Sequence, residues 1–256
     1  MRLFSRRIHK TVREGDAVEI SEQDGIRYLH LGNNTVQSAM RIKDPLHLEL
    51  SYTQAMMAFL IFAPEPRSAL LVGLGGGSVA KFLFHHYPDT RIRVAEINAE
   101  VIRIARQFFF VPDDTRLEII ETDATRLLPD ETNHDVLLLD GYDAHFQVPA
   151  LATPEFYQHC ADALTPRGIL SVNLWRNDPM FDHYHDRLLD CFEGRVLLLP
   201  AERRGNTIAL CFNPFALKKD RRLLHQRAIE LEVRHRLPYT RFLAELLPQV
   251  DRQTTD

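Results

Sequence analysis

The 256-residue chain has few of the residues that cross-link a protein. It contains three cysteines, Cys160, Cys191 and Cys211, which is an odd number, and they form neither a CxxC pair nor a metal-site spacing. This pattern excludes a disulfide framework and a zinc-ribbon protein, and it predicts reduced thiols and a cytoplasmic location. We expect no metal site.

Long hydrophobic runs and a strong charge of either sign are also missing. The N-terminal stretch MRLFSRRIHKTVREGD has no apolar core of signal-peptide length. The most apolar window, residues 55–66, ends in a proline-rich turn and is too short to cross a bilayer. The formal net charge of −4 argues against a nucleic-acid-binding surface. We therefore expect neither nucleic acid nor a membrane as a partner.

The first 50 residues have the pattern of a small antiparallel sheet. Apolar residues alternate with polar ones around two turn signals, Asp24-Gly25 and Gly32-Asn33-Asn34. Residues 49–62 follow as an apolar segment that ends at a proline-rich turn, which indicates a buried helix.

From residue 68 the pattern changes to strands that alternate with helices. The expected strands are 68–74, 91–97, 116–122, 134–140 and 168–175, and the expected helices are 77–87, 99–109, 124–128 and 154–164. Such alternation predicts an α/β fold, with a mostly parallel, Rossmann-like sheet of the methyltransferase type covered by helices on both faces. Residues 195–201 and 206–212 are expected to complete the sheet edge. We predict three parts: a β domain at 1–50, a nucleoside-binding catalytic domain at 51–214 and a helical extension at 215–256.

A glycine cluster joins the first parallel strand to its helix, in LLVGLGGGSVAKFL at residues 71–84. The glycines are Gly73, Gly75, Gly76 and Gly77. Ligands of open α/β sheets bind beyond the carboxyl ends of the strands, where glycines let the backbone approach closely. Tight strand-to-helix turns also use glycine for structural reasons alone, so the cluster by itself is weak evidence.

Acids at the ends of the next two strands strengthen the interpretation. Glu96 follows Gly73 by 23 residues and is suited to bind ribose hydroxyls. Asp123 and Ala124 end the third strand, where an acid or amide commonly meets adenine. NAD and S-adenosylmethionine both satisfy this constellation. Because Ser78 or Ala80 replaces the last glycine of a pyrophosphate loop, a sulfonium nucleoside fits at least as well as NAD.

Two carboxylates follow the fourth strand in VLLLDGYDAHF, at Asp140 and Asp143. An alkyl amine has a pKa near 10 and is protonated at pH 7, so it must lose a proton before it attacks carbon. Adjacent carboxylates raise each other's pKa, which suits one of them to act as a base. The alternative is that Asp140 only caps a turn and Asp143 is a solvated loop residue.

The order of these motifs resembles the spermidine synthase (polyamine aminopropyltransferase) family. VGLGGGSVAKFL is similar to its Gly-Gly-Gly-Asp-Gly-Gly loop, AEIN to its Val-Glu-Ile-Asp segment and DGYD to its Asp-Ser-Ser-Asp pair. TPEFYQHC and TPRGILSVN resemble its Lys-Glu-Phe-Tyr helix and its Lys-Pro-Gly-Gly-Ile-Leu turn. The resemblance extends over about residues 15–212 and includes the N-terminal β region, which ordinary methyltransferases lack.

The resemblance implies roles for individual residues. It implies that Asp140 is the proton acceptor and that Asp143 binds the amine substrate. It also implies that Gln37 contacts the donor, that Tyr52 forms a wall of the amine site and that Gln54 stands where the family has an amine-anchoring glutamate. A polyamine-type substrate, decarboxylated S-adenosylmethionine as donor and a homodimer are further expectations.

The glycine loop departs from the family pattern. Sliding the loops into register puts Gly75 where the family has an aspartate, whose carboxylate is expected to pair with the ammonium of the donor's aminopropyl tail. Losing one partner of such a pair costs roughly 2–5 kcal/mol of binding. Three hypotheses follow: an aminopropyltransferase, a methyltransferase that uses intact S-adenosylmethionine, and a nucleoside-binding homologue without turnover.

Overall fold

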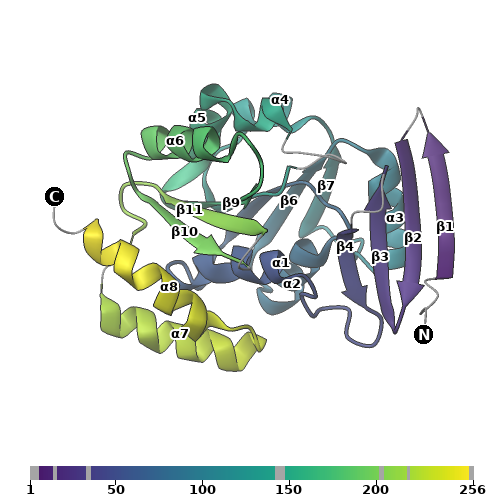
Figure 1. The fold of residues 1–256 in the computed structure, drawn as a ribbon, viewed down its shortest axis with the longest axis horizontal. Coiled ribbons are helices and arrows are strands. Elements are labelled where there is room, and N and C mark those ends of the chain that lie inside the picture. Colours follow the sequence, from purple (N-terminus) through teal and green to yellow (C-terminus); the bar gives the residue numbers. More distant parts are fainter. Residues whose placement is uncertain are drawn as a thin grey trace.

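A four-stranded antiparallel sheet forms the first part of the chain, as its alternating apolar residues predict. The structure, a computed structural model, describes residues 6–13, 16–32, 36–141, 148–201, 205–217 and 220–253. The strands pair in chain order: β1 (Arg6–Arg13), β2 (Asp16–Gln23), β3 (Ile26–Leu31) and β4 (Val36–Arg41). Val18, Ile20, Leu29 and Met40 are buried against helix α3 (Ala99–Phe109), so the small sheet packs on the larger domain (Figure 1).

The larger domain contains a seven-stranded sheet in the order β10-β11-β9-β8-β5-β6-β7. Its parallel strands are β5 (Ser68–Val72), β6 (Arg91–Glu96), β7 (Leu117–Glu121), β8 (His134–Leu139) and β9 (Leu164–Trp175). The antiparallel strands β10 (Val196–Pro200) and β11 (Asn206–Phe212) complete one edge. The predicted mostly parallel, Rossmann-like sheet is confirmed.

Strand order places a switch point beside β5. The chain runs from β5 outward through β6 and β7, then returns to the other side of β5 with β8. The chain therefore leaves the carboxyl ends of the neighbouring strands β5 and β8 in opposite directions along the sheet, toward β6 and toward β9. This is where open α/β sheets bind their ligands.

Helices cover both faces of this sheet because its strands alternate their apolar side chains. Val136 and Leu138 of β8 belong to one core, whereas Leu137 and Leu139 belong to the other. The first core also contains α2 (Ser78–His86) and part of α3, and the second contains α4 (Ala124–Leu127), α5 (Pro154–Ala163) and α6 (Phe181–Cys191).

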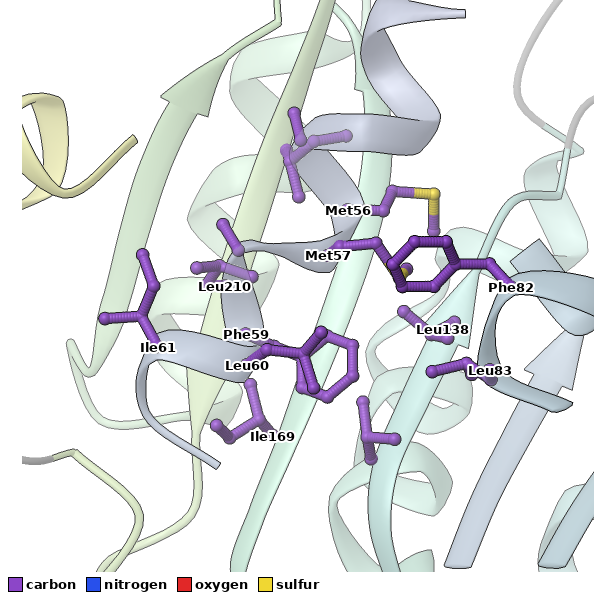
Figure 2. Close-up of a cluster of buried hydrophobic side chains, with 14 of the residues drawn as sticks. Met56, Met57, Phe59, Leu60, Ile61, Phe82, Leu83, Leu138, Ile169 and Leu210 are labelled. Carbon is purple, nitrogen blue, oxygen red and sulfur yellow. The ribbon is translucent and has the colours of Figure 1, made fainter. Parts of the chain in front are cut away.

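The apolar segment after the small sheet is a buried helix, as predicted. It comprises α1 (Ser51–Met56) and a 3-10 turn, η1 (Met57–Ile61), whose five residues are all buried. Figure 2 shows these side chains beside Phe82 and Leu83 of α2 and beside Leu138, Ile169 and Leu210 of three strands. Tyr52 belongs to the same short helix α1 as the buried Met56, so the packing of this core also positions Tyr52 in the site described below.

The charged C-terminal segment forms two helices, α7 (Arg221–His235) and α8 (Tyr239–Arg252). Arg236 adopts the left-handed conformation with φ of 58° and ends α7, and Pro238 precedes α8. Short 3-10 turns, η2 (Leu128–Asp130) and η3 (Pro149–Ala152), complete the described elements. Among the helices formed by the described residues, none has the length and apolar composition to span a membrane.

Candidate active site

A pocket opens between the small sheet and the carboxyl ends of β5 and β8. It has room for a few water molecules, about 40 Å³. Strand β4, helix α1, the glycine loop, helix α2 and the end of β8 all contribute side chains or backbone to it. The lining residues are Gln37, Ser38, Tyr52, Thr53, Met56, Leu71, Val72, Gly73, Leu74, Gly75, Ser78, Val79, Ala80, Leu138 and Asp140.

Two glycines of the loop are required by close packing. A Cβ atom on Gly73 would lie 2.4 Å from the backbone oxygen of Asp140, and Gly73 has φ of 93°. A Cβ atom on Gly77, the left-handed residue that begins α2, would lie 2.2 Å from Val111 Cγ2. At Gly73 no side chain fits without backbone movement, so glycine lets the loop lie against the Asp140 backbone; at Gly77 the Val111 side chain would have to move.

The loop contains no carboxylate in any register with the family pattern. Paired letter for letter, GLGGGS brings Gly76 opposite the family's aspartate and Gly75 beside it. Gly75 also has a positive φ, of 53°, and its missing Cβ would lie 3.8 Å from Ser38 Cβ. The absence of a loop charge therefore does not depend on how the loops are aligned.

Glu96 holds the glycine loop from the end of β6. Its Oε2 atom accepts a hydrogen bond from the Leu74 backbone N–H at 2.9 Å, and its Oε1 atom accepts one from the Asn98 N–H at 2.9 Å. Burial raises the pKa of Glu96, and these backbone N–H groups oppose that shift. A carboxylate has about four lone-pair sites, so the loop contacts and the predicted ribose contact compete for the same two oxygens.

Asp123 begins α4 as its N-cap. Its Oδ1 atom accepts hydrogen bonds from the Thr125 backbone N–H at 2.9 Å and from the Thr125 hydroxyl at 2.8 Å. Ala124 is buried in the core beside it. Neither residue lines the pocket, so a role at the adenine end of a nucleoside remains a prediction.

Asp140 is the acidic residue that lines the pocket. Its backbone N–H donates to the Val72 carbonyl at 3.0 Å, which continues the pairing of β8 with β5. Burial raises the pKa of Asp140, and hydrogen bonds from the Asn173 and Tyr52 side chains lower it. The Tyr52 hydroxyl also lies 3.4 Å from the Gln37 carbonyl oxygen. The structure thus brings together Gln37, Tyr52 and Asp140 from three separate predictions.

Two asparagines that the sequence analysis did not single out orient Asp140. Asn173 Nδ2 donates to Asp140 Oδ1 at 2.8 Å, and Asn206 Nδ2 donates to Asn173 Oδ1 at 2.8 Å. The second bond fixes the Asn173 amide with its nitrogen toward the carboxylate. A signal exists in the sequence, because Asn173 is an amide inside the apolar strand GILSVNLW and is only 2% exposed.

Replacing Asn173 by leucine is expected to move the acid limb of the kcat/KM pH profile to higher pH. Asn173→Leu removes a hydrogen bond that favours the ionised carboxylate, so the pKa of Asp140 rises. A base must be ionised to act, so activity falls most at low pH and approaches wild type in alkaline buffer.

The matched control for this experiment is Asn213→Leu. Asn213 Nδ2 donates to the carbonyl oxygens of Ala161 and Thr165 and does not contact Asp140. It should lower stability without moving the acid limb. An unchanged profile in Asn173→Leu would remove Asn173 from its positioning role.

The structure does not place the other two predicted amine-binding residues, Gln54 and Asp143, in the pocket. Gln54 is turned away from the pocket: its Nε2 atom donates to the Leu48 carbonyl at 2.7 Å, and it does not line the cavity. Successive residues of a helix point about 100° apart, so Gln54 cannot share the direction of Tyr52. Asp143 lies in 142–147, outside the described residues, and its role stays a prediction.

Lys81 is a buried cation near the loop that sequence reasoning missed. It is 1% exposed, and its Nζ atom donates to the Phe109 carbonyl at 2.7 Å and to Met40 Sδ at 3.1 Å. Burial lowers the pKa of Lys81 to about 8. The lysine ties α2 to the end of α3 and to β4, so it helps hold the small sheet against the site. Its one sequence signal is a charge within the apolar run VAKFLF.

No metal centre accompanies these residues in the part of the chain that the structure describes. There, no three His, Cys, Asp or Glu side chains are grouped so that they could hold a metal ion. The polar groups of the pocket are instead arranged around one carboxylate and one glycine loop.

Comparison with known proteins agrees with this arrangement. The spermine/spermidine synthase domain family matches residues 49–187. A polyamine aminopropyltransferase of Chromobacterium violaceum is 40% identical over 258 aligned positions, which cover 99% of this chain and 98% of that protein.

Solved structures show the same fold. A probable spermidine synthase from Corynebacterium glutamicum superposes with a TM-score of 0.74 at 20% identity, over 88% of this chain and 86% of that one. Human methyltransferase-like protein 13, in complex with SAH, has a TM-score of 0.65 at 25% identity, over 73% of this chain and 92% of that one. With a matched domain over more than half of its length and a relative aligned almost end to end, the chain belongs to the spermine/spermidine synthase family of transferases.

Proposed function

We propose that the chain is a polyamine aminopropyltransferase. It moves the aminopropyl group of decarboxylated S-adenosylmethionine to an amine such as putrescine and releases methylthioadenosine. The observation that carries the proposal is the Asp140 carboxylate, which lines the pocket beside the glycine loop and is oriented by Asn173 and Tyr52. The 40% identity to a curated aminopropyltransferase along the whole chain supports it.

Asp140 serves as the base in this reaction. The amine nitrogen attacks the methylene carbon bonded to sulfur, and the carbon–sulfur bond breaks with its electron pair going to sulfur. The proton lost by the amine passes to Asp140. Burial raises the pKa of Asp140. The pKa of Asp140 is therefore closer to that of an alkyl amine, which is near 10, and proton transfer from the amine to Asp140 is easier. The sulfonium is a good leaving group, so alignment of the two substrates supplies much of the acceleration.

The donor would bind across the carboxyl ends of β5, β6 and β7. The glycine loop suits it because Gly75 lines the pocket, and a Cβ atom there would meet nothing closer than Ser38 Cβ at 3.8 Å, so the backbone at this residue is open to a ligand. Glu96 would face the ribose, Asp123 and Ala124 the adenine, and Gln37 the tail. Tyr52 and Asp143 would hold the amine on the other side of the reacting carbon.

A methyltransferase that uses intact S-adenosylmethionine is the second candidate. It is favoured by the loop, which has glycine at both positions where the family's aspartate could fall. Without that charge, the extra carboxylate of the intact donor meets no like charge from the loop.

Calorimetric titration separates the two. The purified protein is titrated with decarboxylated S-adenosylmethionine, with S-adenosylmethionine and with methylthioadenosine, and release of methylthioadenosine from donor plus putrescine is followed by mass spectrometry. Tighter binding of the decarboxylated donor and release of methylthioadenosine are expected. Preference for the intact donor would favour the methyltransferase, and no binding of any of the three would contradict both enzyme functions.

A cytoplasmic homodimer that acts without nucleic acid or membrane completes the proposal. Burial raises the pKa of the thiols of Cys160, Cys191 and Cys211, so they stay protonated and slow to oxidise, as suits a reducing compartment. Light scattering of the purified protein tests the dimer.

A further inference from the structure

Ser38 occupies the space that the glycine loop leaves empty. It lies on β4 of the small sheet, is 6% exposed and lines the pocket with Gly75 and Asp140. A Cβ atom built on Gly76 would lie 2.6 Å from Ser38 Oγ and 2.8 Å from Phe109 Cδ1. The hydroxyl therefore stands where a side chain on residue 76 would begin.

This packing leaves no room for a carboxylate side chain at position 76 of the loop unless its neighbours move. An aspartate at position 76 would meet both Ser38 and Phe109. At position 75 the φ of 53° is one that aspartate can also adopt, as Asp24 does in this chain, so the glycine there is a feature of the sequence and is not required by packing. The atom nearest to a Cβ built on Gly76 is Ser38 Oγ, which comes from the small sheet.

The Ser38 hydroxyl has the chemistry to receive an amine. A hydroxyl oxygen offers two acceptor lone pairs. Within the described residues, no protein group forms a hydrogen bond with Ser38 Oγ, and the atom is not one of the fully buried polar atoms that lack a partner, so it is accessible from the pocket. A ligand in the pocket is the group placed to satisfy it.

We propose that Ser38 Oγ accepts a hydrogen bond from the terminal ammonium of the donor's aminopropyl tail, and so replaces the loop carboxylate as the residue that recognises the tail. This inference rests on the proposed aminopropyltransferase function. It identifies the small sheet, rather than the glycine loop, as the element that recognises the aminopropyl tail of the donor.

A neutral acceptor changes selectivity as well as affinity. A hydroxyl does not repel a carboxylate as an aspartate does, so the chain discriminates less against intact S-adenosylmethionine. Lys81 of α2 is a buried cation close to Ser38, because its Nζ atom contacts Met40, which lies two residues after Ser38 on β4. It does not line the pocket, and its charge faces the Phe109 carbonyl rather than the tail.

The test compares two ligands that differ in the tail amine. Calorimetry measures binding of decarboxylated S-adenosylmethionine and of methylthioadenosine to wild type and Ser38→Ala. Ser38→Ala removes a hydrogen bond to a charged group, so its affinity for the decarboxylated donor should fall about 10-fold or more. Methylthioadenosine has no amine and should bind within about two-fold of wild type, by the same reasoning.

Ser21→Ala is the matched control. Ser21 is also 6% exposed and lies in the same sheet, but its hydroxyl contacts His30 and it is not in the pocket. It should change neither affinity. Ser38→Asp tests the effect of charge. The added carboxylate should increase the affinity for the decarboxylated donor, and it should decrease the affinity for the intact donor by repelling that donor's carboxylate.

The outcomes distinguish this inference from the proposed function. If Ser38→Ala weakens both ligands equally, or neither, while wild type binds the decarboxylated donor, the role of Ser38 is overturned and the function stands. If wild type binds the decarboxylated donor but releases no methylthioadenosine with putrescine or with any other polyamine, the function fails and the binding comparison still decides Ser38. Failure of wild type to bind that donor overturns both.

Discussion

Asp140→Asn is expected to lower kcat by about two to four orders of magnitude, the usual contribution of a positioned general base. Asparagine has nearly the same shape, and its oxygen can still accept the bond that Asn173 donates to Asp140 Oδ1. It cannot take a proton at neutral pH, so the incoming amine stays protonated. Donor affinity should stay within about two-fold, because the substitution removes a proton acceptor and not a wall of the donor site.

Asp135→Asn provides the matched control for this measurement. Asp135 lies near the start of β8, the strand that ends just before Asp140, and its Oδ2 atom accepts hydrogen bonds from the backbone N–H groups of Arg67 and Ser68. It should cost stability and leave kcat nearly unchanged. Steady-state kinetics on both variants, with calorimetry for the donor, separates the effects, and full activity in Asp140→Asn would take the role of base away from Asp140.

Gly73→Ala is expected to destabilise the protein by about 3 kcal/mol or more and to abolish activity. The new Cβ atom would lie 2.4 Å from the Asp140 carbonyl oxygen, which is backbone and cannot rotate away. Overpacking of this kind costs about 1–3 kcal/mol, and a left-handed conformation adds about 1–2 kcal/mol for alanine. Relief of the clash moves the Asp140 segment, so the base and the loop lose their alignment together.

A second glycine isolates the clash from the backbone strain. Gly25 has φ of 78°, and a Cβ atom there would meet nothing within 4 Å. Gly25→Ala should therefore cost only the conformational part, about 1–2 kcal/mol. Urea unfolding of both variants gives the difference, and equal losses would show that the contact with Asp140 is not what requires glycine at position 73.

Local features of the site were predictable from the sequence because they depend on neighbours along the chain. The glycine loop, Glu96 and Asp140 each follow a strand whose apolar pattern is clear, and parallel strands bring their carboxyl ends to one edge. Even there, the prediction was incomplete. Glu96 was assigned to a ribose, whereas its oxygens also accept the loop's own backbone N–H groups.

Features that depend on contacts between distant segments were missed. Asn173 reaches Asp140, and Asn206 reaches Asn173, across 33 residues of sequence in each case, only because β9 pairs with both β8 and β11. Gln54 was assigned to the amine site by its place beside Tyr52, yet the direction of a helical side chain is set by the packing of α1 in the core. The helical period shows that Tyr52 and Gln54 point in different directions, but it does not show which of them faces the pocket.

The sequence by itself determined the strand and helix order, the glycine loop and the end-of-strand acids, since hydrophobic period and turn residues act over a few positions. It was also enough to indicate the family. Only the tertiary structure decided what faces the loop. Ser38 and Phe109 fill the space above Gly76 because the small sheet and α3 pack against each other. A missing carboxylate is visible in the sequence, but the group that stands in its place comes from a strand almost 40 residues earlier and is brought there by burial of apolar surface.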